Sequence, residues 1–118
     1  MLPIIGNARI CLYRGVTDMR KSFDGLCGII EQHFSVSVLS GAVFVFVNRR
    51  RDRVKLLIFD GDGLLLIYKR LEAGQFRVPA GAAGQVELSS AELSMLLEGI
   101  TPLRVSKRWQ RPQKKSDK

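Results

Sequence analysis

The stretch that most constrains the fold is residues 43–71, where turn residues divide three short apolar runs. The runs span residues 43–47, 54–59 and 64–68, and they are rich in the Val, Ile, Phe and Tyr typical of strands. The repeated Asp-Gly pair at residues 60–63 supplies the glycines that a tight hairpin turn needs. We therefore predict three strands joined by two tight connections. Because the second and third runs are almost wholly apolar, they are expected to be central strands covered on both faces.

The connection between the first two runs is strongly basic. Guanidinium groups match phosphate oxygens, and a turn lets several of them point the same way. The candidate phosphate contacts of this stretch are Arg49, Arg50, Arg51, Arg53 and Lys55, extended by Lys69 and Arg70. The alternative is a solvated loop whose charge is partly neutralised by Asp52 and by the carboxylates of residues 60–63.

Charge is distributed unevenly along the 118 residues. The net charge is +8, and residues 104–118 contribute +6 of it, because they hold seven basic side chains and one acidic one. We predict one globular domain over residues 1–103 and a flexible basic tail over residues 104–118. Such a tail favours a polyanionic or acidic partner, although it can also serve solubility alone. Its candidate nucleic-acid contacts are Arg104, Lys107, Arg108, Trp109 and Arg111, of which Trp109 can stack on a base or enter a protein interface.

The segments that flank this stretch predict further strands. Residues 9–13 form a short apolar run, and residues 85–88 are expected to be extended. Residues 75–79 alternate between apolar and polar side chains and end at a proline, which predicts a short edge strand.

A first helix is predicted near residues 18–34 from apolar side chains at helical spacing, with Thr17 or Asp18 as its cap. Gly25 and Gly28 lie inside this helix, where each costs about 1 kcal/mol relative to alanine. We interpret the two glycines as a sign that the helix approaches the sheet closely.

A second helix is predicted near residues 90–98. Ser89 followed by Glu92 matches a capping box, and Gly99 ends the helical pattern. Together the elements predict a single α+β domain, in which two helices pack on a mostly antiparallel sheet of four to six strands.

Little in the sequence points to catalysis or to a cofactor. His33 is the single histidine and has no convincing metal-binding partner, so we interpret it as a helix-end surface residue. Asp60 and Asp62 are interpreted as turn residues, and a Mg²⁺ site there is the alternative. We therefore expect a protein that is not an enzyme and needs no metal or cofactor.

The two cysteines, Cys11 and Cys27, are expected to be free thiols in a reducing compartment. The sequence shows neither a signal peptide nor an apolar run long enough to span a membrane. A cytoplasmic protein without membrane contact is therefore expected.

Several separated motifs resemble one family, the small TnpB-type accessory proteins of bacterial insertion sequences of class sixty-six. This is not the RNA-guided nuclease that shares the label. The similar stretches are residues 15–26, 44–46, 48–55, 60–64, 68–76 and 96–100, and the resemblance covers roughly residues 7–103. It implies a product of a mobile element, made beside a separate transposase, that assists transposition without cutting DNA.

The leading hypothesis is a non-enzymatic accessory protein that binds DNA phosphates, the transposase or both through its basic surface, with little preference for DNA sequence. One alternative is an adaptor that contacts the transposase and does not touch DNA. Another is a Mg²⁺-dependent nuclease that uses Asp60 and Asp62.

Overall fold

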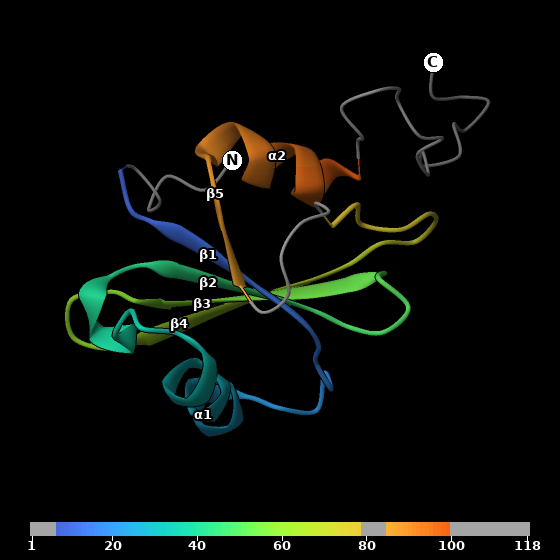
Figure 1. Cartoon of the computed structure of the whole chain (residues 1–118). Helices are drawn as coiled ribbons and strands as arrows, with labels where there is room; N and C mark the ends of the chain where they lie inside the picture. Colours follow the sequence, from blue (N-terminus) through green and yellow to red (C-terminus); the bar gives the residue numbers. More distant parts are fainter. Residues whose placement is uncertain (1–6, 79–84, 100–118) are drawn as a thin grey trace, which may run out of the picture.

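The computed structural model describes residues 7–78 and 85–99, and the structural statements below concern these residues. They form one five-stranded sheet with the strand order β4-β3-β2-β1-β5 and a helix on each face (Figure 1). The elements in chain order are β1 (Ile10–Val16), α1 (Phe23–His33), the 3-10 helix η1 (Val38–Ser40), β2 (Val43–Val47), β3 (Arg53–Phe59), β4 (Leu64–Arg70), β5 (Gln85–Leu88) and α2 (Ser90–Glu98).

The sheet is antiparallel except at one pair of strands. Neighbours β2 and β3, and β3 and β4, form two successive hairpins, and β5 pairs antiparallel with β1. The parallel pair is β1 and β2, and the long connection that a parallel pair requires contains α1. The prediction of an α+β fold, with two helices on a mostly antiparallel sheet, is confirmed.

Each helix covers one face of the sheet, so the core has two layers (Figure 1). Leu26 and Ile30 of α1 pack against Phe44 and Phe46 of β2. On the opposite face, the side chains of α2 pack with alternate residues of the same strand, such as Val45. All five residues of β2 are buried, because this strand lies in the middle of the sheet with a helix on each side.

The prediction that residues 64–68 form a central strand is wrong. These residues begin β4, which lies at one edge of the sheet, and its side chains are half-buried or exposed. The predicted edge strand at residues 75–79 is also wrong for its described part, because residues 75–78 form no strand. The Phe76 side chain is nevertheless fully buried in the α2-side core, so this irregular segment contributes to packing.

The predicted start of the first helix is wrong by several residues. The helix begins at Phe23, and Ser22, rather than Thr17 or Asp18, is the residue that precedes it. The two glycines do not mark a close approach to the sheet either. A Cβ atom at Gly28 would meet nothing within 4 Å, and one at Gly25 would meet the Lys21 side chain at 3.1 Å.

The second helix follows its prediction closely. The Ser89 hydroxyl accepts a hydrogen bond from the Glu92 N–H at 3.0 Å, and the Glu92 carboxylate accepts one from the Ser89 N–H at 2.8 Å. This reciprocal pair satisfies two donors at the start of α2. Gly99 then ends the helix with a left-handed φ of 72°.

The remaining predictions about single residues concern the thiols and the histidine. Cys11 and Cys27 are both free, and burial raises the pKa of the Cys11 thiol. His33 is exposed at the last residue of α1, as predicted. Among the described residues, no helix has the length and apolar composition needed to cross a membrane. The predicted tail at residues 104–118 lies outside the described residues, with Arg104, Lys107, Arg108, Trp109 and Arg111.

Candidate nucleic-acid interface

Basic residues gather at one end of the sheet, where β2 ends and β3 begins. At this end Arg53 of β3 lies opposite Arg70 of β4, and the loop after β1 is joined to β2 by a hydrogen bond from the Thr17 N–H to the Val47 carbonyl. We call this region the basic end. Its cationic side chains are Arg20, Lys21, Arg49, Arg50, Arg51, Arg53, Lys69 and Arg70.

The turn between β2 and β3, residues 48–53, is shaped by its first residue, and we call it the arginine turn. The Asn48 Oδ1 atom accepts hydrogen bonds from the N–H groups of Asp52 and Arg53, both at 3.0 Å. The Asn48 Nδ2 atom donates to the Asp52 carboxylate at 2.8 Å. Arg51 adopts a left-handed φ of 61°, which is uncommon for a residue other than glycine. Asn48 therefore fixes the turn that presents the arginines.

The segment that follows β4 also supports the backbone of the arginine turn. The Phe76 N–H donates to the Arg51 carbonyl at 2.6 Å, and the Leu71 N–H donates to the Asp52 carbonyl at 2.8 Å. The Gln75 Nε2 atom donates to the Arg50 carbonyl at 2.9 Å. The backbone of the arginine turn is therefore held by hydrogen bonds from residues 19 to 25 positions further along the chain.

The side chains of Arg49, Arg50 and Arg51 are exposed to solvent. Within the part of the chain that the structure describes, they form no side-chain hydrogen bond or ion pair. The nearby Asp52 carboxylate is held by Asn48. Three guanidinium groups are thus presented to solvent on a fixed backbone, which suits the binding of phosphate oxygens.

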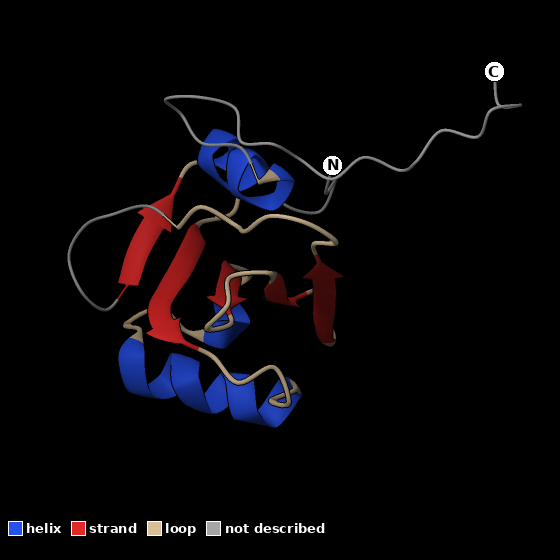
Figure 2. Cartoon of the chain, turned by 90° about the vertical axis from the view of Figure 1, so that its right-hand side faces the viewer, coloured by secondary structure: helices blue, strands red, loops and turns tan. Residues whose placement is uncertain are grey.

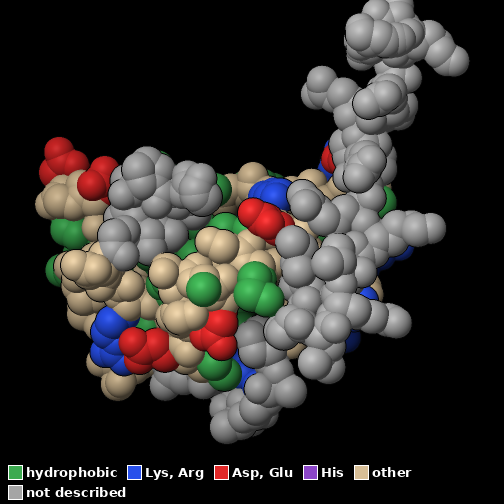
Figure 3. Space-filling view, turned by 90° about the horizontal axis from the view of Figure 1, so that it is seen from above, with side chains coloured by type: hydrophobic (Ala, Val, Ile, Leu, Met, Phe, Trp, Pro, Cys, Tyr) green, Lys and Arg blue, Asp and Glu red, His purple; other side chains and the backbone are tan. Residues whose placement is uncertain are grey.

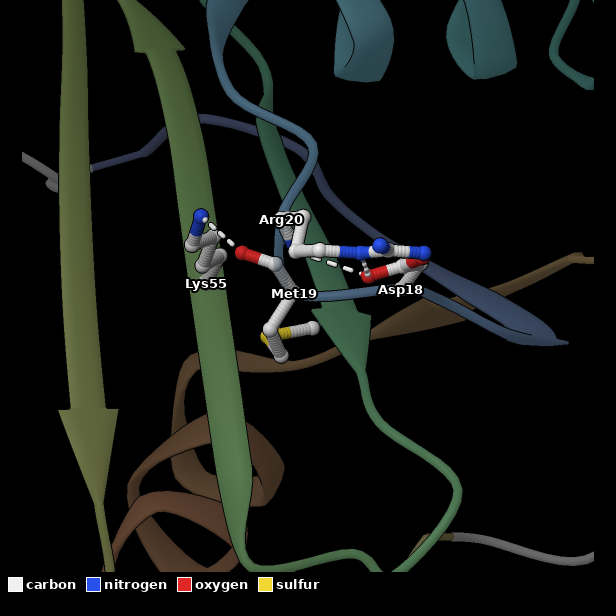
Figure 4. Close-up of polar contacts among 4 residues, drawn as sticks. All are labelled: Asp18, Met19, Arg20 and Lys55. Atoms are coloured by element: carbon white, nitrogen blue, oxygen red, sulfur yellow. Dashed lines mark hydrogen bonds and ion pairs between the residues drawn. The ribbon is translucent and has the colours of Figure 1, made fainter.

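Lys55 does not belong to this exposed set, and its prediction as a phosphate contact is not supported by its position. Its side chain is only 6% exposed, and its Nζ atom donates to the carbonyls of Met19 at 2.8 Å and Lys21 at 2.7 Å. Nζ also lies 4.7 Å from the centre of the Tyr68 ring. Lys55 holds the loop before α1 against the sheet (Figure 4).

The loop before α1 adds two basic side chains, Arg20 and Lys21, that the sequence patterns had placed on a helix. Arg20 forms an ion pair with Asp18 at 2.7 Å (Figure 4). The hydrogen bonds from Arg20 lower the pKa of Asp18 to about 2. The Arg20 side chain remains 91% exposed, so it can still reach an external anion. The Lys55 contacts and the Thr17–Val47 hydrogen bond join residues distant in sequence, and they show that this loop belongs to the basic end.

The predicted extension of the surface along β4 is partly engaged within the protein. Arg53 donates to the Tyr68 hydroxyl at 3.2 Å, which raises the Arg53 pKa further. Lys69 donates to the Leu97 carbonyl at 2.6 Å, at the end of α2. Arg70 forms an ion pair with Glu72 at 3.0 Å. These three residues add positive charge to the basic end but are less available than the exposed arginines.

The chain leaves α2 next to the support of the arginine turn. A Cβ atom at Gly99 would come within 3.8 Å of the Gln75 carbonyl oxygen and 3.9 Å of the Leu71 side chain. Gly99 is the last described residue, and the basic segment of residues 104–118 begins five positions later. The last described residue of the chain therefore lies beside the residues that support the arginine turn.

The opposite end of the sheet carries the turn between β3 and β4, residues 60–63, which we call the acidic turn. Asp60 and Asp62 are exposed there, and the Asp60 N–H donates to the Gly63 carbonyl at 2.7 Å. No group of three potential metal ligands occurs among residues 7–78 and 85–99. Figure 3, which views the α2 side, shows acidic side chains gathered toward its left edge.

Comparison with known proteins places these features in one family. The chain matches the family model described as IS66 Orf2 like protein over residues 8–107. It is 36% identical over 113 residues to uncharacterized protein y4hO of Sinorhizobium fredii, across 96% of this chain and 92% of that protein. It is 32% identical over 100 residues to uncharacterized protein y4jC of the same organism, across 85% of this chain and 86% of that protein. No solved structure gives a significant match.

Proposed function

The chain belongs to the family of IS66 Orf2-like proteins, which links it to the transposition of an insertion sequence, and we propose that it assists this process by binding DNA phosphates. The observation that carries the proposal is the arginine turn, where Arg49, Arg50 and Arg51 are exposed on a braced backbone. In this proposal the protein is an accessory factor without catalytic activity. It acts beside the transposase of the same element.

The chemistry of the basic end favours the DNA backbone over base edges. Guanidinium groups bind phosphate oxygens, and these contacts position a protein on DNA without reading its sequence. The major groove admits an α-helix or a two-stranded ribbon, whereas β2 and β3 are interior strands of a five-stranded sheet and cannot enter it as a free ribbon. We therefore expect binding that shows little sequence preference and weakens steeply with salt.

Arg20, Lys21 and the basic segment of residues 104–118 extend the same surface. The segment begins five positions after Gly99, and the location of Gly99 beside Gln75 and Leu71 supports a joint action of segment and turn on one stretch of DNA. In this arrangement the turn provides a fixed contact, and the segment provides additional charge.

The test is fluorescence anisotropy with duplex DNA across a salt series. The duplexes carry either the element's end sequence or a scrambled sequence. The forms of the protein are the intact chain, an Arg49→Ala/Arg50→Ala/Arg51→Ala variant, and a chain truncated after residue 103. Removing three phosphate contacts should lower the slope of log affinity against log salt by about 2–3. Both duplexes should respond alike.

Arg9→Ala is the matched control for a single Arg50→Ala exchange. Arg9 lies before β1, and its guanidinium pairs with Glu87 at 3.0 Å, away from the basic end. Arg50→Ala should weaken binding more than Arg9→Ala, although both remove one positive charge. An unchanged affinity in the triple variant would contradict the role of the turn.

Two other outcomes separate the competing functions. Absence of DNA binding by every form, together with capture of the transposase at high salt, would favour an adaptor that does not contact DNA. DNA cleavage that requires Mg²⁺ and disappears in Asp60→Asn/Asp62→Asn would favour a nuclease.

A further inference from the structure

The outer edge of β4 is an apolar strand edge without a neighbour among the described residues. β4 is the last strand of the sheet and pairs only with β3. In Figure 2 it lies at the right-hand end of the row of strands, with no strand on its outer side. Such an edge presents a row of unpaired backbone N–H and C=O groups to a further strand.

Apolar side chains lie on both faces of this edge strand. Leu64 and Leu66 face the α1 side, whereas Ile67 faces the α2 side. Leu65 and Tyr68 are large apolar side chains that remain 36% and 48% exposed. On the α2 side, a groove of about 270 Å³ runs between β3, β4 and α2, and apolar side chains provide most of its lining.

The other edge of the sheet is built differently. β5 has only four residues, and its Glu87 side chain forms an ion pair with Arg9 beside β1. Short length and charge are common means of preventing strand addition at an edge. β4 has seven residues and carries charge only in Lys69 and Arg70, its last two. Its first five positions therefore lack the protection that β5 has.

We propose that this edge pairs with the same edge of a second copy of the chain. The two β4 strands run antiparallel about a twofold axis that passes through Leu66, and the two sheets become one. Leu66 is the middle residue of the apolar run at residues 64–68, so this register places the whole run against itself. Leu64 then lies opposite Tyr68 of the second copy, and Leu65 lies opposite Ile67.

Charge complementarity is compatible with the same register. With the axis at Leu66, Arg70 comes beside Asp62 in the acidic turn of the second copy, and the symmetry repeats this contact. Moving the axis to Leu65 still brings Arg70 opposite an acidic residue, Asp60, but it places the Asp62 carboxylate opposite Tyr68. Moving the axis to Ile67 places Arg70 opposite Leu64. The register at Leu66 is therefore the one that matches apolar with apolar residues and cation with anion.

The first test is analytical ultracentrifugation of the full chain without DNA, from low micromolar to submillimolar concentration. The intact protein should shift from monomer to dimer as its concentration rises. Leu65→Lys should remain a monomer, because it buries a charge opposite Ile67. Val16→Lys is the matched control, since Val16 is 55% exposed in β1, which β2 and β3 separate from this edge, and it should dimerise normally. A monomeric intact protein, or a Leu65→Lys variant that dimerises equally well, would overturn the proposal.

A charge exchange tests the register with variants at exposed positions. Arg70→Asp and Asp62→Arg each place like charges together at two symmetric contacts, and each should weaken dimerisation by about tenfold. The double variant Arg70→Asp/Asp62→Arg restores an opposite pair and should regain most of the affinity. A double variant that dimerises no better than the single variants would exclude this register.

The proposed dimer does not depend on the proposed function. One consequence of the dimer does. Because the paired β4 strands run antiparallel, the two basic ends lie at opposite strand ends of the joined sheet. One dimer then presents two separate surfaces for DNA. A dimer that does not bind DNA would retain the pairing and contradict only the proposed function.

Discussion

The two hairpin turns at the ends of β3 differ in charge and in how they are held. The arginine turn takes its hydrogen bonds from Asn48 and from residues 71–76, which follow β4. The acidic turn closes on itself, with hydrogen bonds between residues 60 and 63 and between residues 60 and 62. In the acidic turn a glycine, Gly61, provides the left-handed residue, whereas Arg51 does so in the arginine turn.

The difference shows where the fold uses distant contacts. A turn with glycines needs only local geometry, because glycine enters the left-handed region without steric cost. An arginine in that region costs stability, so surrounding contacts must hold it there. The arginine turn has such contacts, and among the described residues they leave the guanidinium groups of Arg49, Arg50 and Arg51 without hydrogen-bond partners. A structure of this kind is expected where the side chains of a turn serve binding.

The largest expected effect comes from removing the distant support near the basic end. Lys55→Met keeps the length of the side chain but leaves the Met19 and Lys21 carbonyls without their charged donor. We expect a loss of about 2–3 kcal/mol in the free energy of unfolding, measured with urea. Arg49→Met, at an exposed position, is the control and should change stability by less than about 0.5 kcal/mol. Equal stability of the two variants would show that the support is dispensable.

Substitutions at the left-handed residues of the two turns should change stability less, and the two turns should respond with opposite signs. Gly61→Ala should lower stability by about 1 kcal/mol, because Gly61 has a φ of 76°. Arg51→Gly should leave stability unchanged or raise it slightly, because glycine relieves the strain at a φ of 61°. The same Arg51→Gly variant should bind DNA less tightly. A clear loss of stability in Arg51→Gly would contradict the strain at this turn.

The smallest effect concerns the pH dependence of stability at the basic end. Arg20 lowers the pKa of Asp18 to about 2, chiefly through a side-chain hydrogen bond, whereas the unfolded chain has a value of about 3.9. The contribution of this pair is complete above the unfolded pKa and is lost as pH falls from about 4 to about 2. The melting temperature should depend less on pH across this range in Asp18→Asn and in Arg20→Gln than in the intact protein. Since the pair is exposed, the difference will be small.

Much of the fold could be predicted because its signals are local. The hairpins on either side of β3 follow from apolar runs divided by turn residues, and α2 follows from its capping box and Gly99. The position of β4 could not be predicted, because an apolar run does not distinguish a central strand from an edge strand that carries apolar side chains on both faces. The start of α1 also escaped prediction, since Lys55 holds the preceding loop through contacts between residues distant in sequence.

The exposed arginines of the candidate site could be predicted from the sequence, but the residues at its border could not. A run of arginines at a hairpin turn is visible in the sequence, and the structure exposes Arg49, Arg50 and Arg51 together. Lys55 looked like part of the same run, but it points to the α1 side of the sheet and is buried. Arg20 falls within the helix predicted near residues 18–34, but it lies in the loop before α1, which Lys55 holds against the sheet. Proximity in the sequence therefore overestimates the contribution of Lys55 to the basic surface and misses the contribution of Arg20.

The most direct measurement compares the intact protein with the variant Arg49→Ala/Arg50→Ala/Asp60→Asn/Asp62→Asn in DNA-binding titrations at several salt concentrations. This variant loses two cations at the arginine turn and two anions at the acidic turn, so its net charge stays at +8. If the arginine turn binds phosphates, affinity should fall about tenfold or more and the salt slope should decrease by about 2. An affinity and a salt slope equal to those of the intact protein would show that binding depends on overall charge, and would contradict the role assigned to the arginine turn.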